Sequence, residues 1–185
     1  MENYKELATR TECEYSDALL ERAKENVRLL HAVLGLSGEI SELRAAIAKD
    51  DKVNILEEIG DMYWYLAIIE NMRNINFAPG ENVVEASAYD LVDDLEYFVG
   101  QLTDGLKKSI FYGKEFLDGD VIMHADDVAL SLCSLVNLYD GSVANVKETN
   151  INKLKARYGE KFSEDMAINR DLVKESSVLE ENLNG

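Results

Sequence analysis

Residues 38–66 read GEISELRAAIAKDDKVNILEEIGDMYWYL, and most of what the sequence predicts about architecture starts from this stretch. Polar residues occupy its middle, at 49–54, and apolar residues recur every three or four positions on both sides. Such spacing indicates amphipathic α-helices that pack on a core. If the chain turns back at the polar residues, the two helices lie antiparallel. We therefore predict a helix hairpin over residues 28–72.

Two pairs of carboxylates flank the predicted turn. Glu39 and Glu42 precede it, and Glu58 and Asp61 follow it. Each pair has i, i+3 spacing, which places both side chains on one face of a helix. Glu42 and Glu58 each lie about eight residues from the centre of the turn, which is roughly 12 Å along a helix. The hairpin would therefore bring four carboxylates together at one height.

Four clustered carboxylates predict a site for a divalent cation, because like charges in a partly dry site repel one another strongly. Oxygen ligands suit Mg²⁺ or Mn²⁺. Either pair taken alone is more simply a solvated helix face, since 30% of the residues are charged. The apolar run at 62–69, directly after Asp61, favours the cation site, because a helix that is apolar all round is normally buried.

The composition predicts a single all-α domain. The chain has 185 residues, enough for one core, and only one proline. Its 19 basic and 36 acidic residues give a net charge of −17. This charge argues against binding of polymeric nucleic acid, which depends on Lys and Arg. Two cysteines, a polar N-terminus and the lack of a long apolar run lead us to expect a cytoplasmic protein that binds no membrane.

A second helix hairpin is predicted over about 83–140, after a loop that contains Pro79. It matches the first in length and order of elements. Either the hairpin is duplicated, with one degenerate copy and a four-helix core, or two helical hairpins merely look alike. The helices are expected over about 15–48 with a break near Gly35 and Gly38, 53–73, 83–111 and 120–139, preceded by a short helix or arm at 1–12.

Basic residues are concentrated in two places despite the acidic composition. Lys153 and Arg157 are i, i+4 neighbours in a basic segment at about 142–171, and Lys108 and Lys114 flank a Tyr-Gly pair. Such clusters are commonly solvated, but in so acidic a chain they are also the natural partners of a ligand's phosphates. There is no Glu-x-x-His for a ferritin-like di-iron site and no glycine-rich phosphate loop.

Several of these motifs resemble the MazG-like all-α nucleoside triphosphate pyrophosphohydrolases. In the hairpin they are LHAVLGL at 30–36, ExxE at 39–42, ExxD at 58–61 and WYL at 64–66. Residues 150–171, which include NINKLKARY at 150–158, are similar to the C-terminal segment of phage-type and bacterial members. The resemblance is weak between the two regions, over 74–145.

The resemblance implies an enzyme that hydrolyses nucleoside triphosphates, often the deoxy forms, to the monophosphate and pyrophosphate. Cations would bridge the phosphates and activate water, and Glu39 would orient that water. Lys153 and Arg157 would bind phosphates as charge develops. The implied ligands of Mg²⁺, or of Mn²⁺ as a substitute, are Glu39, Glu42, Glu58 and Asp61. Further substrate contacts are expected from Trp64, which also fits a core position, Tyr65, Lys108, Lys114, Asn169 and Arg170.

Two other functions stay open at the level of sequence. A helical, highly acidic interaction protein could imitate the charge of DNA and bind a basic partner, although the apolar setting of Asp61 does not favour this. A family member could also bind nucleotides without hydrolysing them, although intact ExxE and ExxD motifs argue against it. Members with one hairpin complete their core by oligomerising, so a homodimer is favoured here unless the second hairpin supplies those helices within the chain.

Overall fold

The computed structural model describes residues 3–77, 83–159, 163–169 and 171–183. Over these residues all regular structure is helical and there is no strand, so the all-α prediction is confirmed. The helices are α1 Tyr4–Thr9, α2 Asp17–Glu25, α3 Val27–Ala48, α4 Lys52–Arg73, α5 Ala88–Tyr112, α6 Asp118–Leu138, α7 Val143–Tyr158, α8 Glu164–Ile168 and α9 Leu172–Leu183.

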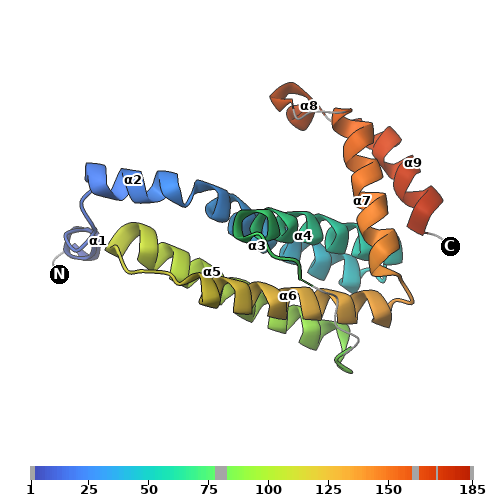
Figure 1. Cartoon of the computed structure of the whole chain (residues 1–185), viewed down its shortest axis with the longest axis horizontal. Helices are drawn as coiled ribbons and strands as arrows, with labels where there is room; N and C mark the ends of the chain where they lie inside the picture. The colour runs from blue at the N-terminus through green and yellow to red at the C-terminus, as the bar shows by residue number, and fades with distance from the viewer. Residues whose placement is uncertain (1–2, 78–82, 160–162, 170, 184–185) are drawn as a thin grey trace.

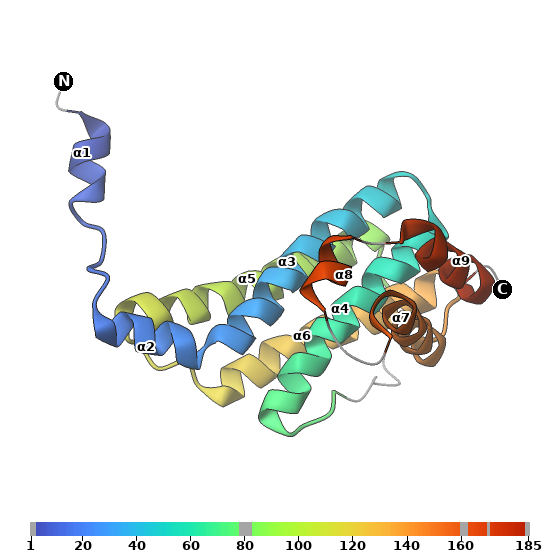
Figure 2. The ribbon, with the colours of Figure 1, turned by 90° about the horizontal axis from the view of Figure 1, so that it is seen from above.

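Helices α3 and α4 form the predicted antiparallel hairpin and lie side by side (Figures 1 and 2). The polar residues between them make the turn. Asp50 adopts a left-handed backbone with φ 54°, and the Asp51 side chain caps α4 by accepting a hydrogen bond from the Asn54 amide at 3.2 Å. An acidic cap satisfies amide groups that a helix start leaves unpaired. The turn therefore ends one helix and begins the next within three residues, 49–51.

The second hairpin, α5 and α6, packs against the first. Helix α5 contacts α3, α6 contacts α4, and the two hairpins share one hydrophobic core. Helix α5 begins five residues later than predicted, because Ser87 and Asp90 form a capping box at its start. Gly113 ends it with a φ of 65°, a conformation that glycine adopts without steric cost.

The predicted break near Gly35 and Gly38 is wrong, because both residues lie inside α3 and the break falls at Asn26. Gly35 instead makes room for a side chain of α4. A Cβ atom there would lie 2.0 Å from Cζ of Tyr65, so glycine lets the Tyr65 ring of α4 pack directly on the backbone of α3. A Cβ atom at Gly38 would meet nothing within 4 Å.

The C-terminal helices α7 and α9 pack against the hairpin and bury apolar side chains, although the sequence from about 142 is mostly polar. Helix α7 crosses α4 at a steep angle, and α9 lies beside α7 and also contacts α4 (Figure 1). Leu179 and Leu183 of α9 are buried in the common core. These two helices therefore add a lateral layer that covers one side of the α3–α4 hairpin.

Helices α6 and α1 concern two predictions from the sequence, the absence of a membrane-spanning helix and a short N-terminal helix. Helix α6 is long and apolar enough to cross a membrane by length and composition, but just over half of its apolar window is buried among the other helices. The core helix of a globular protein has the same character. Helix α1 is the expected short helix at the N-terminus, contains no buried residue and stands apart from the bundle (Figure 2).

Candidate functional site

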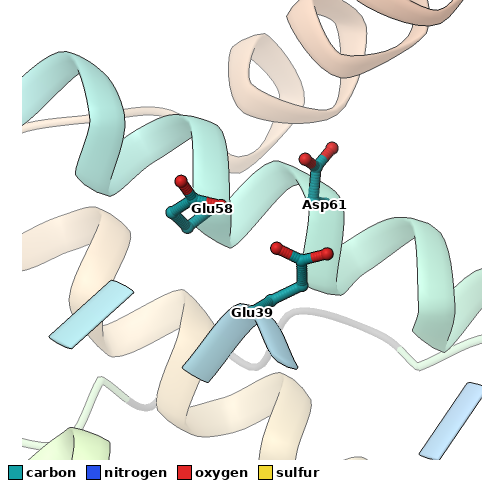
Figure 3. A group of neighbouring side chains, drawn as sticks. All are labelled: Glu39, Glu58 and Asp61. Carbon is teal, nitrogen blue, oxygen red and sulfur yellow. The ribbon is translucent and has the colours of Figure 1, made fainter. Parts of the chain in front are cut away.

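The hairpin brings three carboxylates together. One oxygen atom each from Glu39, Glu58 and Asp61 lies within 4.8 Å of the other two. Figure 3 shows Glu39 rising from α3 toward Glu58 and Asp61 on α4. All three side chains are half-buried. We call Glu39, Glu58 and Asp61 the carboxylate group.

Glu42, the fourth carboxylate of the sequence pattern, lies outside this group and is exposed. Three residues along a helix correspond to about 300° of rotation, so Glu42 points roughly 60° away from Glu39. It lines an adjoining cavity of about 540 Å³, together with Glu57 and Glu58 of α4 and Glu175 of α9. Its charge still contributes to the raised pKa values of Glu39 and Glu58.

The carboxylate group is electrostatically unfavourable when fully ionised. Burial, followed by the charge of Asp61, raises the pKa of Glu39 to about 7. Burial, the charge of Glu57 and a hydrogen bond with Glu39 raise the pKa of Glu58 to about 9. Without a cation, Glu58 therefore keeps its proton at neutral pH and donates it in a hydrogen bond to Glu39.

Asp61 also faces a buried cation that α7 supplies. Nζ of Lys153 lies 2.6 Å from both carboxylate oxygens of Asp61 and 3.1 Å from Oε1 of Glu57. Asn150, one turn earlier on α7, donates to Oδ1 of Asp61 at 2.5 Å. Burial lowers the pKa of Lys153, but the charges of Asp61 and Glu57 outweigh it and raise the pKa overall. The side chain, 0% exposed, is therefore a buried ammonium.

Arg157, one turn after Lys153, has a different partner. Its Nε donates to Oε1 of Glu175 at 2.9 Å, and its second guanidinium contact, to Oε2, is 2.5 Å long. Glu175 belongs to α9 and is buried. Burial opposes the charge of Arg157, but its hydrogen bonds, led by the one to Glu175, raise its pKa. The two basic residues that the sequence places on one helix face are thus both in ion pairs with carboxylates.

Glu57, Asn150 and Glu175 belong to this site, and the sequence did not single them out. A signal existed for two of them. Glu57 precedes Asp61 by four residues and Asn150 precedes Lys153 by three, so each shares a helix face with a predicted site residue. Nothing in the sequence marks Glu175, because its role depends on how α9 packs.

The predicted aromatic contacts lie next to the carboxylate group. The rings of Trp64 and Tyr65 are 4.9 Å apart, and His31 of α3 lies 5.8 and 5.6 Å from them, all edge to face. Trp64 and Tyr65 are half-buried and His31 is exposed. Burial and then the charges of Glu39 and Asp61 raise the pKa of Tyr65. The His31–Trp64–Tyr65 cluster therefore adjoins the carboxylates.

The other residues predicted to bind substrate are Lys108, Lys114, Asn169 and Arg170. No interaction described for them involves the carboxylate group. Lys108 forms an ion pair with Asp104 at 2.5 Å, and Lys114 is exposed beyond the end of α5. Asn169 is exposed and donates to Asp165. Arg170 lies outside the described residues.

No protein-family model, curated protein or solved structure matches this chain. Chemically, the site offers three convergent carboxylates and a buried ammonium on one side of them. An adjoining aromatic cluster completes it.

Proposed function

We propose that this protein is an Mg²⁺-dependent nucleoside triphosphate pyrophosphohydrolase of the MazG-like all-α type, with Mn²⁺ able to replace Mg²⁺. It would convert nucleoside triphosphates, deoxy forms included, to the monophosphate and pyrophosphate. The observation that carries the proposal is the carboxylate group, in which two facing helices place three oxygen ligands within 4.8 Å of one another. The resemblance of the ExxE and ExxD motifs supports the substrate class.

The donor set fits a hard divalent cation. All three groups offer oxygen, which Mg²⁺ and Mn²⁺ prefer. The pKa values of Glu39 and Glu58 are raised, which is the behaviour of carboxylates without sufficient positive charge near them. When bound, the cation would neutralise charge on the polyphosphate and activate water for attack on phosphorus.

The chain's own residues take distinct parts in this proposal. Glu39, Glu58 and Asp61 hold the cation, and Glu39 also orients the attacking water. The aromatic pair Trp64 and Tyr65 lies beside the carboxylates and contacts the base. Glu42, at the exposed rim, lies outside the ligand set and adds its negative charge to the site.

The two basic residues need different roles from those that the sequence predicted. Lys153 is fully buried and paired with Asp61, so it acts on the carboxylate group rather than on solvent-borne phosphates. Arg157 is held by Glu175. It can bind a phosphate by exchanging one oxyanion for another, since guanidinium pairs with both in the same forked geometry.

The test is pyrophosphate release from a panel of NTPs and dNTPs, with Mg²⁺ and with EDTA. We expect release that EDTA abolishes, and a loss of about 100-fold or more in Glu58→Gln. Glu25→Gln, at an exposed position on α2, is the matched control and should keep the parental rate. The Glu58→Gln protein should stay folded, because the change removes charge from a group of like charges.

The same panel separates the alternatives. Nucleotide binding without release would indicate a family member that does not hydrolyse its ligand. Neither binding nor release with any nucleotide would contradict the proposal and favour an acidic interaction protein, for which the net charge of −17 is the supporting observation.

A further inference from the structure

We infer that the ammonium of Lys153 takes the place of a second metal cation, so that the site binds one divalent cation rather than two. The inference rests on the proposed function only in that it requires the carboxylate group to be the cation site. It assigns Lys153 as a positioning residue that holds Asp61, instead of a phosphate ligand.

The first observation is the position of Nζ of Lys153 between two carboxylates. It lies 2.6 Å from each oxygen of Asp61 and 3.1 Å from Glu57. Lys153 reaches Asp61 from α7, which packs on α4. Glu39 and Glu58 belong to the hairpin and lie beside Asp61 (Figure 3). Glu57 would be a natural ligand for a second cation, but the ammonium already bridges it to Asp61.

The second observation is charge. Glu39, Glu57, Glu58 and Asp61 together carry four negative charges when ionised, and Lys153 compensates one of them. A divalent cation at the carboxylate group compensates two more. Another cation beside Asp61 and Glu57 would lie close to a buried ammonium, where repulsion is screened little by solvent.

The third observation is a glycine in α4 at the point where α7 packs on it. Gly60, next to Asp61 on α4, faces α7, and a Cβ atom there would lie 3.2 Å from Cβ of Asn150. The absence of a side chain at Gly60 lets α7 approach α4 closely. Asn150 and Lys153, on the same face of α7, then both reach Asp61.

The arrangement also explains why Asp61 can be a ligand although it forms an ion pair. A carboxylate has about four lone-pair sites on its two oxygens. Lys153 contacts both oxygens of Asp61 and Asn150 contacts Oδ1, which leaves about one site for a cation. An oxygen of Asp61 still lies within 4.8 Å of Glu39 and Glu58. Lys153 and Asn150 therefore fix the orientation in which Asp61 meets the cation, as partners of metal ligands commonly do.

The test is the number of Mn²⁺ ions bound per chain, measured from the free-Mn²⁺ EPR signal during titration of the full chain. We expect one ion in the parent and one in Glu57→Gln, because Glu57 pairs with Lys153 and is not a ligand. The ion should bind about 10-fold or more weakly in Glu57→Gln, since the variant loses a negative charge and a partner of the site. We expect a second ion in Lys153→Met, which frees Asp61 and Glu57. Lys155→Met, at an exposed position of the same helix, should bind one.

Each result has a definite meaning. Two equivalent ions in the parent, or loss of an ion in Glu57→Gln, would overturn the inference and leave the proposed function standing. A folded Lys153→Met protein that still binds one ion would also overturn it. Absence of bound Mn²⁺ in the parent would overturn the metal site and the inference together. If Lys153→Met does not fold, the parent and Glu57→Gln decide the question by themselves.

Discussion

Glu58 is half-buried and lies close to the charges of Glu57, Glu39 and Glu42. Both features disfavour the ionised form of its side chain. Its pKa is raised to about 9 and that of Glu39 to about 7, from an ordinary value of 4.5. The folded state therefore holds protons that the unfolded state has released. Stability from this source is full below about pH 4.5 and is lost as the pH rises through 7 and 9.

We therefore expect the metal-free protein to melt at a lower temperature at pH 8.5 than at pH 6. The shift should be a few degrees, since 1 kcal/mol corresponds to about 2–4 °C in a chain of this size. Thermal unfolding in EDTA measures it. Mg²⁺ should raise the melting temperature more at pH 8.5 than at pH 6, because the cation replaces the lost protons.

Glu58→Gln is the variant that isolates this effect, because it removes the group with the more strongly raised pKa. It should melt higher than the metal-free parent at pH 8.5 and depend less on pH. Glu25→Gln should behave like the parent. An identical pH dependence in the parent and Glu58→Gln would show that the carboxylate group is not the source.

At the scale of elements, α3 and α4 meet through a glycine that the sequence led us to interpret as a helix breaker. The Tyr65 ring occupies the space that a side chain at Gly35 would need, whereas Gly38 faces open space. The two glycines lie three residues apart in one helix, so each serves as the control for the other.

Gly35→Ala should lower the free energy of unfolding by about 1–3 kcal/mol, because the new methyl group forces Tyr65 to move. Gly38→Ala should raise it by about 0.5–1 kcal/mol, since alanine favours a helix more than glycine does. Urea unfolding of both variants measures the difference. Equal effects of the same sign would contradict the close packing of α3 and α4 at Gly35.

The contact of α7 with α9 yields a second prediction for the elements, because it depends on a buried ion pair between Arg157 and Glu175. Arg157→Ala removes the guanidinium that forms two hydrogen bonds with the buried carboxylate of Glu175, which should cost about 2–4 kcal/mol of stability. It should also lower kcat/KM by about one to three orders of magnitude, as expected for a residue that binds phosphate in the transition state.

A double variant separates the two effects. Arg157→Met with Glu175→Leu replaces the ion pair by apolar contacts, which should recover most of the stability but not the activity. Lys24→Ala, at a well-exposed position, should change stability by no more than about 0.5 kcal/mol. Parental kcat/KM in the double variant would leave Arg157 with a structural role alone.

At the scale of the whole molecule, the second hairpin already completes the core of the first, so a partner chain is not needed for that purpose. An apolar surface is nevertheless exposed on α2 and α3, where Leu20, Val27 and Leu34 recur every seven residues and are 55–61% exposed. Leu20 lies on α2, before the helix break at Asn26, and Val27 and Leu34 lie two turns apart on α3. Exposed apolar side chains at a spacing of seven residues are a feature of helices that pair with another helix.

We expect a homodimer that uses this surface, with a sedimentation mass of twice 20.8 kDa. Leu34→Glu should shift the mass toward that of a monomer, because it places a charge in the centre of the interface. Leu138→Glu is the control, since Leu138 is also exposed but lies on α6. A monomer in the parent protein at all concentrations would contradict the dimer.

The hairpin and its carboxylates could be predicted from the sequence because both arms lie in one short segment and their apolar period is local. The partners of the basic residues could not, since Lys153 and Asn150 reach positions 89–96 residues away in the chain. The packing of α9 was hidden as well, because Leu179 and Leu183 stand among Glu, Ser and Asn. The local spacing of apolar residues predicts where helices form, but it does not predict which helices pack against each other.

The same difference in sequence separation predicts an order of assembly. The carboxylate group closes a short loop within one hairpin, whereas Lys153 joins Asp61 across 92 residues. Short loops close at lower entropic cost than long ones. We therefore expect Mg²⁺ to increase the refolding rate, because it relieves repulsion in a hairpin that forms early. Stopped-flow refolding with Mg²⁺ and with EDTA measures this.

Lys153 should act at the opposite end of the folding reaction. Because its contacts form late, Lys153→Met should increase the unfolding rate and leave the refolding rate nearly unchanged. A slower refolding rate in this variant would contradict the order. The ammonium that compensates the charge of the site would thus form its contacts last. The lifetime of the folded site would then depend on the rate at which α7 dissociates from α4.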